Sequence, residues 1–285
     1  MFFEIGVLRA AAALVGTGLA AWEDARTSFI DDRTTLSMIG LGIVLDVFFL
    51  PQELWLSTAL IALVIGIIGY FAYRAGQFGG GDVLLILGIH LLLPQQTQAL
   101  FASAVQAFAP AYPPVVSILA TASLTAVIVS GVWYAFRLHQ EKGFGKNKTL
   151  AFAVVSAVAV AAIAFSPLSL ALKVFFALLL LPAFFYVLFK REVMDCVVVK
   201  KLRLRDVEDE DVLYLEGLPQ SLVKRFNIQR VLTRGEVKKL RFVEKKTGRR
   251  VWPVCKELPR FAPFLLLGLL FVLFFGDFLV IVLFS

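Results

Sequence analysis

Residues 79–93 read GGGDVLLILGIHLLL, an apolar run that opens on three glycines and one carboxylate. A carboxylate at the boundary of a membrane-embedded helix is by default a candidate for function. Asp24 closes another apolar run near the start of the chain. Two such carboxylates that face each other would share protons, so the pair Asp24 and Asp82 is the first candidate site.

Composition places most of this chain in lipid. Of its 285 residues, 59% are hydrophobic and 27 are Phe, and the mean hydropathy is +0.83, well above that of a soluble domain. A span requires about 20 residues. We predict an all-α polytopic membrane protein of about eight spans: 2–22, 36–50, 55–73, 83–93 (extendable toward 108), 114–136, 150–165, 168–189 and 261–284. The alternative has six spans, with 150–189 as a re-entrant pair.

Lys and Arg divide the loops into two classes. Loops 51–54, 94–113 and 166–169 carry neither residue, whereas loops 23–35, 74–81, 137–149 and 190–260 all carry them. The positive-inside rule then predicts a multi-pass protein of the cell membrane with both termini outside. Asp24 and Asp82 fall together at the cytoplasmic face, which allows one shared site there.

The net charge of +7 originates in 190–260, where basic residues outnumber acidic ones. Residues 197–207 and 212–215 predict two strands, and Thr233 with Glu236 predicts a capped helix over 231–243. We therefore expect a transmembrane catalytic domain over 1–190, a small basic α+β cytoplasmic domain over 191–259 and a final transmembrane helix over 260–285. The positive charge of the cytoplasmic domain suits anionic lipid headgroups, and the domain contains no nucleic-acid recognition motif.

Cysteine and histidine are scarce. Cys196 and Cys255 are the two cysteines, which excludes a disulfide framework and a four-thiolate zinc site. His90 and His139 are the two histidines. We predict neither a metal nor a cofactor.

Two short motifs carry the chemistry: DARTSFI at 24–30 and FGGGDV at 78–83. Charges of both signs at the first are what any cytoplasmic helix end shows. The second is more informative, because three ordered glycines cost roughly 0.5 to 1 kcal/mol each. Such a cost is best explained by a backbone that turns tightly or is approached closely.

In order and spacing the two motifs resemble the GxGD-type aspartyl proteases of the type IV prepilin peptidase group. Within that group the chain is similar to archaeal preflagellin (archaellin) peptidases, since it has no four-Cys cytoplasmic cluster and has a basic domain before its last span. Two features depart from the pattern. Leu84 stands where a Lys often follows the motif Asp, and 150–189 adds two spans.

The resemblance implies that Asp24 and Asp82 are catalytic. Two carboxylates in a partly desolvated site cannot comfortably both ionise, so one activates water while the other polarises the scissile carbonyl. The implied partners are precursors with class III-type signal peptides, whose basic leaders Glu23, Asp31 and Asp32 could receive. Substrate-binding or site-shaping residues would further include Gly79, Gly80, Gly81 and Arg26. Arg26 either pairs with Asp24 or anchors the helix end at the headgroups.

Two other classes of function compete. A secondary transporter would use Asp24 and Asp82 as ion ligands, but would bury them near the bilayer midplane and show internal repeats. A metal-dependent membrane hydrolase using Glu23, Asp24 and Asp82 lacks the usual His. We expect His90 to be packed or pore-lining, and Asp46 and Asp277 to lie near the outer ends of their spans.

Overall fold

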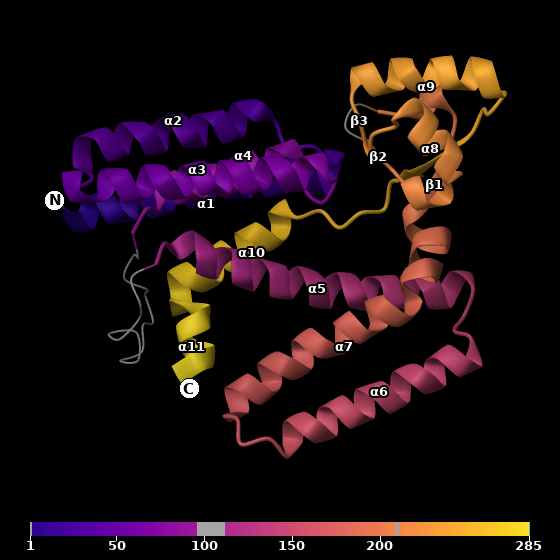
Figure 1. Ribbon diagram of the computed structural model, residues 1–285. Helices are drawn as coiled ribbons and strands as arrows, with labels where there is room; N and C mark the ends of the chain where they lie inside the picture. Colours follow the sequence, from indigo (N-terminus) through magenta and orange to yellow (C-terminus); the bar gives the residue numbers. More distant parts are fainter. Residues whose placement is uncertain (1, 96–111, 209–210, 285) are drawn as a thin grey trace.

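The structure, a computed structural model, describes residues 2–95, 112–208 and 211–284 and is mostly helical (Figure 1). Its α-helices are α1 (Phe2–Thr27), α2 (Asp32–Phe49), α3 (Gln52–Arg74), α4 (Gly80–Leu92), α5 (Pro114–Glu141), α6 (Lys146–Ala164), α7 (Leu170–Glu192), α8 (Gln220–Phe226), α9 (Arg234–Thr247), α10 (Ala262–Phe275) and α11 (Phe278–Phe284). The strands are β1 (Val199–Leu202), β2 (Asp211–Leu213), β3 (Val231–Leu232) and β4 (Trp252–Cys255).

Within the described residues, five helices are long and apolar enough to cross a membrane, rather than the eight predicted. They are α1 from Ile5, α3, α5, α6, and α7 with the π-helix Val193–Val198 that continues it. The others fall short for identifiable reasons: α4 and α10 have 13 and 14 residues, and α2 carries Asp32, Arg33 and Asp46. The chain is a membrane protein, and in its described residues fewer helices meet these requirements of length and composition than there are apolar runs in the sequence.

The last predicted span breaks into α10 and α11 at Gly276, whose φ of +88° lies in the left-handed region that favours glycine. The re-entrant alternative for 150–189 is not favoured, because α6 and α7 form an antiparallel hairpin in which each helix is long enough to cross alone (Figure 1). The predicted extension of the fourth run toward residue 108 lies outside the described residues.

Helices α1 to α4 form a bundle that α10 joins to α5 (Figure 1). The core between them is apolar and fully buried at Leu85 and Ile89 of α4, Ile118 of α5 and Leu269 of α10. Gly268 permits the close approach of α10 to α5, since a Cβ there would lie 2.5 Å from the carbonyl oxygen of Ile118. This packing fixes the ends of α1, α4 and α10 relative to one another.

The outer helices expose apolar side chains, as lipid contact requires. All residues of α6 are described and none is buried, and α3 buries only Thr58. On the inner side of the hairpin, α5 and α7 meet through an aromatic cluster that includes Tyr134, Phe185 and Phe189. A bilayer would cover the remaining apolar faces.

The segment between α7 and α10 forms an antiparallel sheet of order β1-β4-β2-β3, with α8 and α9 packed on it (Figure 1). Trp252 and Leu240 are fully buried in its core. The α+β prediction is confirmed, but the strand predicted over 197–207 was too long. Val197 and Val198 are buried and stay helical, so β1 is confined to Val199–Leu202 before a 3₁₀ turn at Leu204–Asp206.

The predicted cap of α9 is half confirmed. Thr233 Oγ1 accepts the backbone N–H of Glu236 at 3.4 Å, as a capping box requires. The Glu236 carboxylate instead accepts the N–H of Gln229 at 3.2 Å and pairs with Lys239. Glu236 therefore ties α9 to the loop before β3 rather than completing the box.

We expect the two cysteines to differ in reactivity. Cys255 is 4% exposed, and burial raises the pKa of its thiol to about 11, so little thiolate exists near neutral pH. Cys196 is half-buried. Maleimide should therefore modify Cys196 first and Cys255 only after unfolding, as peptide mass spectrometry would record. Equal rates in the folded protein would contradict the packing of β4.

Candidate active site

Asp24 lies one turn before the end of α1, with its side chain directed at the start of α10. The side chain is largely buried, the residue being 7% exposed, and its Oδ2 accepts the backbone N–H of Ala262 at 3.2 Å. Ala262 is the first residue of α10, whose leading N–H groups have no intrahelical acceptor. Asp24 thus satisfies one donor of a helix N-terminus, where negative charge is favoured.

Asp82 lies in the first turn of α4 and stabilises the glycine loop that precedes it. Its Oδ2 accepts the N–H of Gly79 at 3.1 Å, which caps the helix start. At Gly81, a Cβ would lie 2.8 Å from the Cβ of Ile30. Glycine is needed there because α4 passes directly against the connection between α1 and α2, which is the close approach that the sequence predicted.

The two aspartates line one cavity of about 760 Å³. The membrane helices contribute polar side chains to the wall of the cavity, including Ser123 and Ser130 of α5 and Tyr186 of α7. The sheet domain closes the cavity on the other side. A site of this shape can hold an extended peptide and a water molecule beside two carboxyl groups.

The sheet domain contributes charge to the wall. Lys256 Nζ lies 2.6 Å from Glu208 Oε2 and 2.9 Å from Asp211 Oδ1, and all three residues line the cavity. The hydrogen bond from Lys256 holds the pKa of Glu208 below its usual range. Burial lowers the pKa of Lys256, but its hydrogen bonds to Glu208 and Asp211 outweigh burial and raise it. Glu208 and Lys256 therefore stay ionised at neutral pH.

The other acids singled out in the sequence hold the connection between α1 and α2. Glu23 accepts the N–H of Asp31 at 3.0 Å and the hydroxyl of Thr34 at 3.0 Å. Asp31 caps α2 by accepting the N–H of Arg33 at 2.9 Å, and Asp32 is exposed in the first turn. These three acids lie outside the cavity lining.

Of the predicted glycines, Gly79 lines the cavity, while Gly80 and Gly81 do not. Arg26 also lies outside the lining, and its guanidinium stacks 4.0 Å from the centroid of the Trp22 ring. This geometry favours the anchoring role for Arg26 over pairing with Asp24. An Arg and Trp at a helix end suit the membrane interface.

Sequence reasoning missed the residues that immediately precede α10. The Arg260 guanidinium donates to the carbonyl oxygen of Ala25, and Phe261 lies edge-on to Phe78, with centroids 5.0 Å apart. Both Arg260 and Phe261 line the cavity. Their signal was weak, because one Arg before a final apolar run is what any cytoplasmic boundary shows.

Known proteins give one similarity. Residues 11–131 match the type IV leader peptidase family. This part of the chain is similar to that family. The matched segment covers less than half of the chain but includes both Asp24 and Asp82, and it ends within α5.

No curated protein and no solved structure matches the chain significantly. The protein is an aspartic-type leader peptidase, and the family that it matches acts on precursors with prepilin-like leaders. The family match does not reach the sheet domain or α10, which complete the cavity of this leader peptidase.

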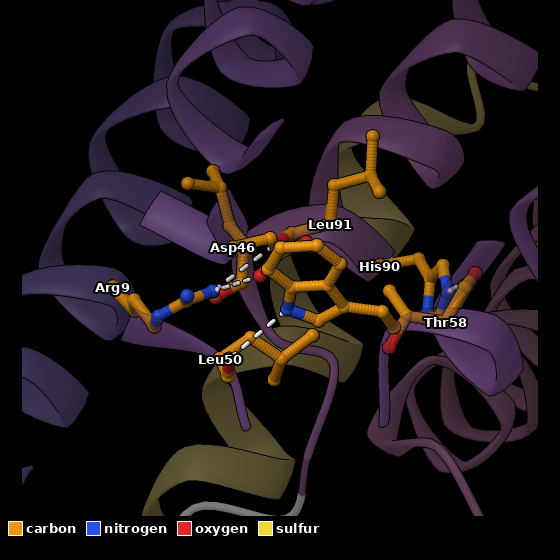
Figure 2. Close-up of polar contacts among 8 residues, drawn as sticks. Arg9, Asp46, Leu50, Thr58, His90 and Leu91 are labelled. Atoms are coloured by element: carbon orange, nitrogen blue, oxygen red, sulfur yellow. Dashed lines mark hydrogen bonds and ion pairs between the residues drawn. The ribbon is translucent and has the colours of Figure 1, made fainter. Parts of the chain in front are cut away.

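Several other polar residues of the bundle are outside the cavity lining, and Figure 2 shows the contacts of three of them, Arg9, Asp46 and His90. His90, in the last turn of α4, is fully buried, with its Nε2 3.1 Å from the carbonyl oxygen of Thr58. This confirms His90 as a packed residue. Arg9 and Asp46 form a buried ion pair of 2.8 Å, and Ser117 donates to Asp277.

Proposed function

We propose that this leader peptidase is a membrane-embedded endopeptidase that removes short basic leaders from archaellin or type IV pilin-like precursors at the cytoplasmic face. The observation that carries the proposal is that Asp24 of α1 and Asp82 of α4 line one cavity between the membrane helices and a basic domain. Such a position gives access to water and to a substrate whose apolar helix stays in the membrane.

The reaction uses the two carboxyl groups as one acid and one base. The ionised carboxylate takes a proton from water, and the water oxygen bonds to the scissile carbonyl carbon. The protonated carboxyl donates a hydrogen bond, and then its proton, to the carbonyl oxygen. When the tetrahedral intermediate collapses, the C–N bond breaks and the new amine takes the proton from the base. One hydroxyl of the intermediate returns its proton to the other carboxylate, which restores both groups. A carboxyl group and a free N-terminus are the products.

Basic leaders fit the charge of the wall formed by the sheet domain. Glu208 and Asp211 share a single Lys256, so a lysine or arginine of the leader could take a place beside one of them. The side chain of Glu208 is 79% exposed and available for exchange of partners. We therefore assign leader binding to these acids rather than to Glu23 and Asp31, whose carboxylates bind groups within the protein, or to Asp32, which lies outside the cavity lining.

We expect Glu208→Gln with Asp211→Asn to raise KM for a basic leader by about two- to fivefold, because each exposed ion pair contributes up to about 1 kcal/mol. The value of kcat should change little. Glu141→Gln, on an exposed acid outside the cavity, is the matched control. Equal KM values for a basic and a neutralised leader in the wild type would contradict the assignment.

The proposed function is tested with purified protein in detergent. Archaellin and pilin-like precursors are incubated separately, and the products are identified by mass spectrometry of their new N-termini. Removal of a leader from either precursor, in the presence of a chelator, is the expected result. No cleavage of either, combined with proton uptake by protein-containing liposomes, would instead establish the transporter alternative.

A further inference from the structure

Residues 259–262 connect the sheet domain to α10 and contact both motifs of the cavity. Ala262 donates its N–H to Asp24 at 3.2 Å, and Arg260 donates to the carbonyl of Ala25. Phe261 packs edge-on against Phe78, next to the glycine loop that carries Asp82. These residues lie about 130 positions beyond the end of the family match, so the match assigns them nothing.

The surroundings of the two aspartates differ in charge. Asp24 receives a backbone N–H at the start of the 14-residue helix α10, and the positive charge of Arg260 acts on it. Asp82 receives the N–H of Gly79 and faces the charge of Asp24. Both carboxyl groups lie at a helix N-terminus and accept one backbone N–H, so these contacts favour neither. Arg260, which binds the carbonyl oxygen of the neighbouring Ala25, makes Asp24 the better place for a single negative charge shared by the two groups.

The other charged groups near the cavity do not reverse this difference. Lys256 is engaged by two carboxylates of the sheet domain, and Arg26 stacks on Trp22. The titratable residues lining the cavity besides the two aspartates and Arg260 are Tyr73, Tyr186, Glu208, Asp211, Cys255 and Lys256. The cavity lining contains two cations, Lys256 and Arg260. Of these two, Arg260 is the one whose charge acts on Asp24.

We propose that Arg260 is a positioning residue that keeps Asp24 as the ionised base and leaves the shared proton on Asp82. The inference rests on the proposed function and assigns the order of its steps. Asp24 takes the proton from water and later gives it to the leaving amine. Asp82 donates its proton to the oxygen of the scissile carbonyl.

The test compares Arg260→Gln with Arg260→Lys, which keeps the positive charge, and with Arg250→Gln, which removes an exposed charge outside the cavity. In profiles of kcat/KM against pH, Arg260→Gln should shift the acid limb to higher pH by about one to two units. This is the shift expected when a positive charge near a carboxylate is removed. Arg260→Lys should keep most of the wild-type limb. An unshifted limb in Arg260→Gln, or equal losses in both variants, would overturn the role of the charge.

A second readout needs no substrate. The infrared carbonyl stretch of protonated carboxyl groups is recorded from pH 5 to 8 for the same proteins, after thermal unfolding has verified their folding. Arg260→Gln should gain a second protonated carboxyl at a pH where wild type and Arg250→Gln have one. Identical spectra would overturn the inference. Failure of the wild type to cleave any precursor would instead contradict the proposed function. The infrared spectra would still test the effect of Arg260 on the protonation of the two carboxyl groups.

Discussion

Asp24→Asn and Asp82→Asn should each lower the rate of leader cleavage by at least about 10²- to 10⁴-fold, the contribution of one general acid or base. Asparagine has nearly the same shape as aspartate but can neither take a proton from water nor deliver one to the carbonyl oxygen. Its amide oxygen can still accept the N–H of Ala262 or of Gly79. The variants should therefore fold, and the loss should appear in kcat.

The matched control is Asp32→Asn, which removes an exposed acid from the first turn of α2 outside the cavity. Its cleavage rate should stay within about twofold of the wild type, since isolated surface changes have small effects. Thermal unfolding in the same detergent separates loss of chemistry from loss of fold. Cleavage by either Asp24→Asn or Asp82→Asn at a rate within tenfold of the wild type would remove that residue from the mechanism.

The second large effect concerns the buried ion pair at the other end of the bundle (Figure 2). Arg9 Nη1 lies 2.8 Å from Asp46 Oδ1 and also donates to the carbonyl oxygens of Leu91 at 3.3 Å and Leu92 at 3.4 Å. It thereby ties α1 and α2 to the end of α4. These same helices α1 and α4 carry Asp24 and Asp82 at their other ends.

We expect Arg9→Met or Asp46→Leu alone to lower the free energy of unfolding by about 3 to 5 kcal/mol, because each leaves one charge buried without its partner. Combining the two should cost less than either alone, since an apolar pair has no charge to desolvate. Denaturant unfolding followed by circular dichroism measures all three. Additive losses in the double variant would contradict a direct interaction between Arg9 and Asp46.

Periodicity and composition predicted the helices well because burial in lipid demands long apolar runs. Of the eight predicted spans, five correspond to helices of the described residues that are long and apolar enough to cross a membrane; α4 and α10 are shorter, and Gly276 interrupts the last run. Asp24 and Asp82 could be proposed as a pair because the charge bias of the loops predicted both acids on one face, and the structure places both in the lining of one cavity. The charge bias is counted from the loop sequences alone, so it can be used without knowledge of tertiary contacts.

The same reasoning could not separate acids that cap helices from acids that face the cavity. Glu23 and Asp31 are acids, as a subsite for a basic leader requires. Their carboxylate oxygens, however, accept hydrogen bonds from N–H and hydroxyl groups of the α1–α2 connection. Arg260 was missed for the opposite reason. Its contact with Ala25 joins residues 235 positions apart, a separation at which no local pattern carries information.

The central claim is that Asp24 and Asp82 act as one catalytic unit. Single-turnover cleavage of a leader-bearing precursor by the wild type, Asp24→Asn, Asp82→Asn and the double variant tests it most directly. Members of one unit are strongly non-additive, so the double variant should be no slower than the slower single variant. Losses that multiply in the double variant, or singles that still cleave, would contradict a shared site.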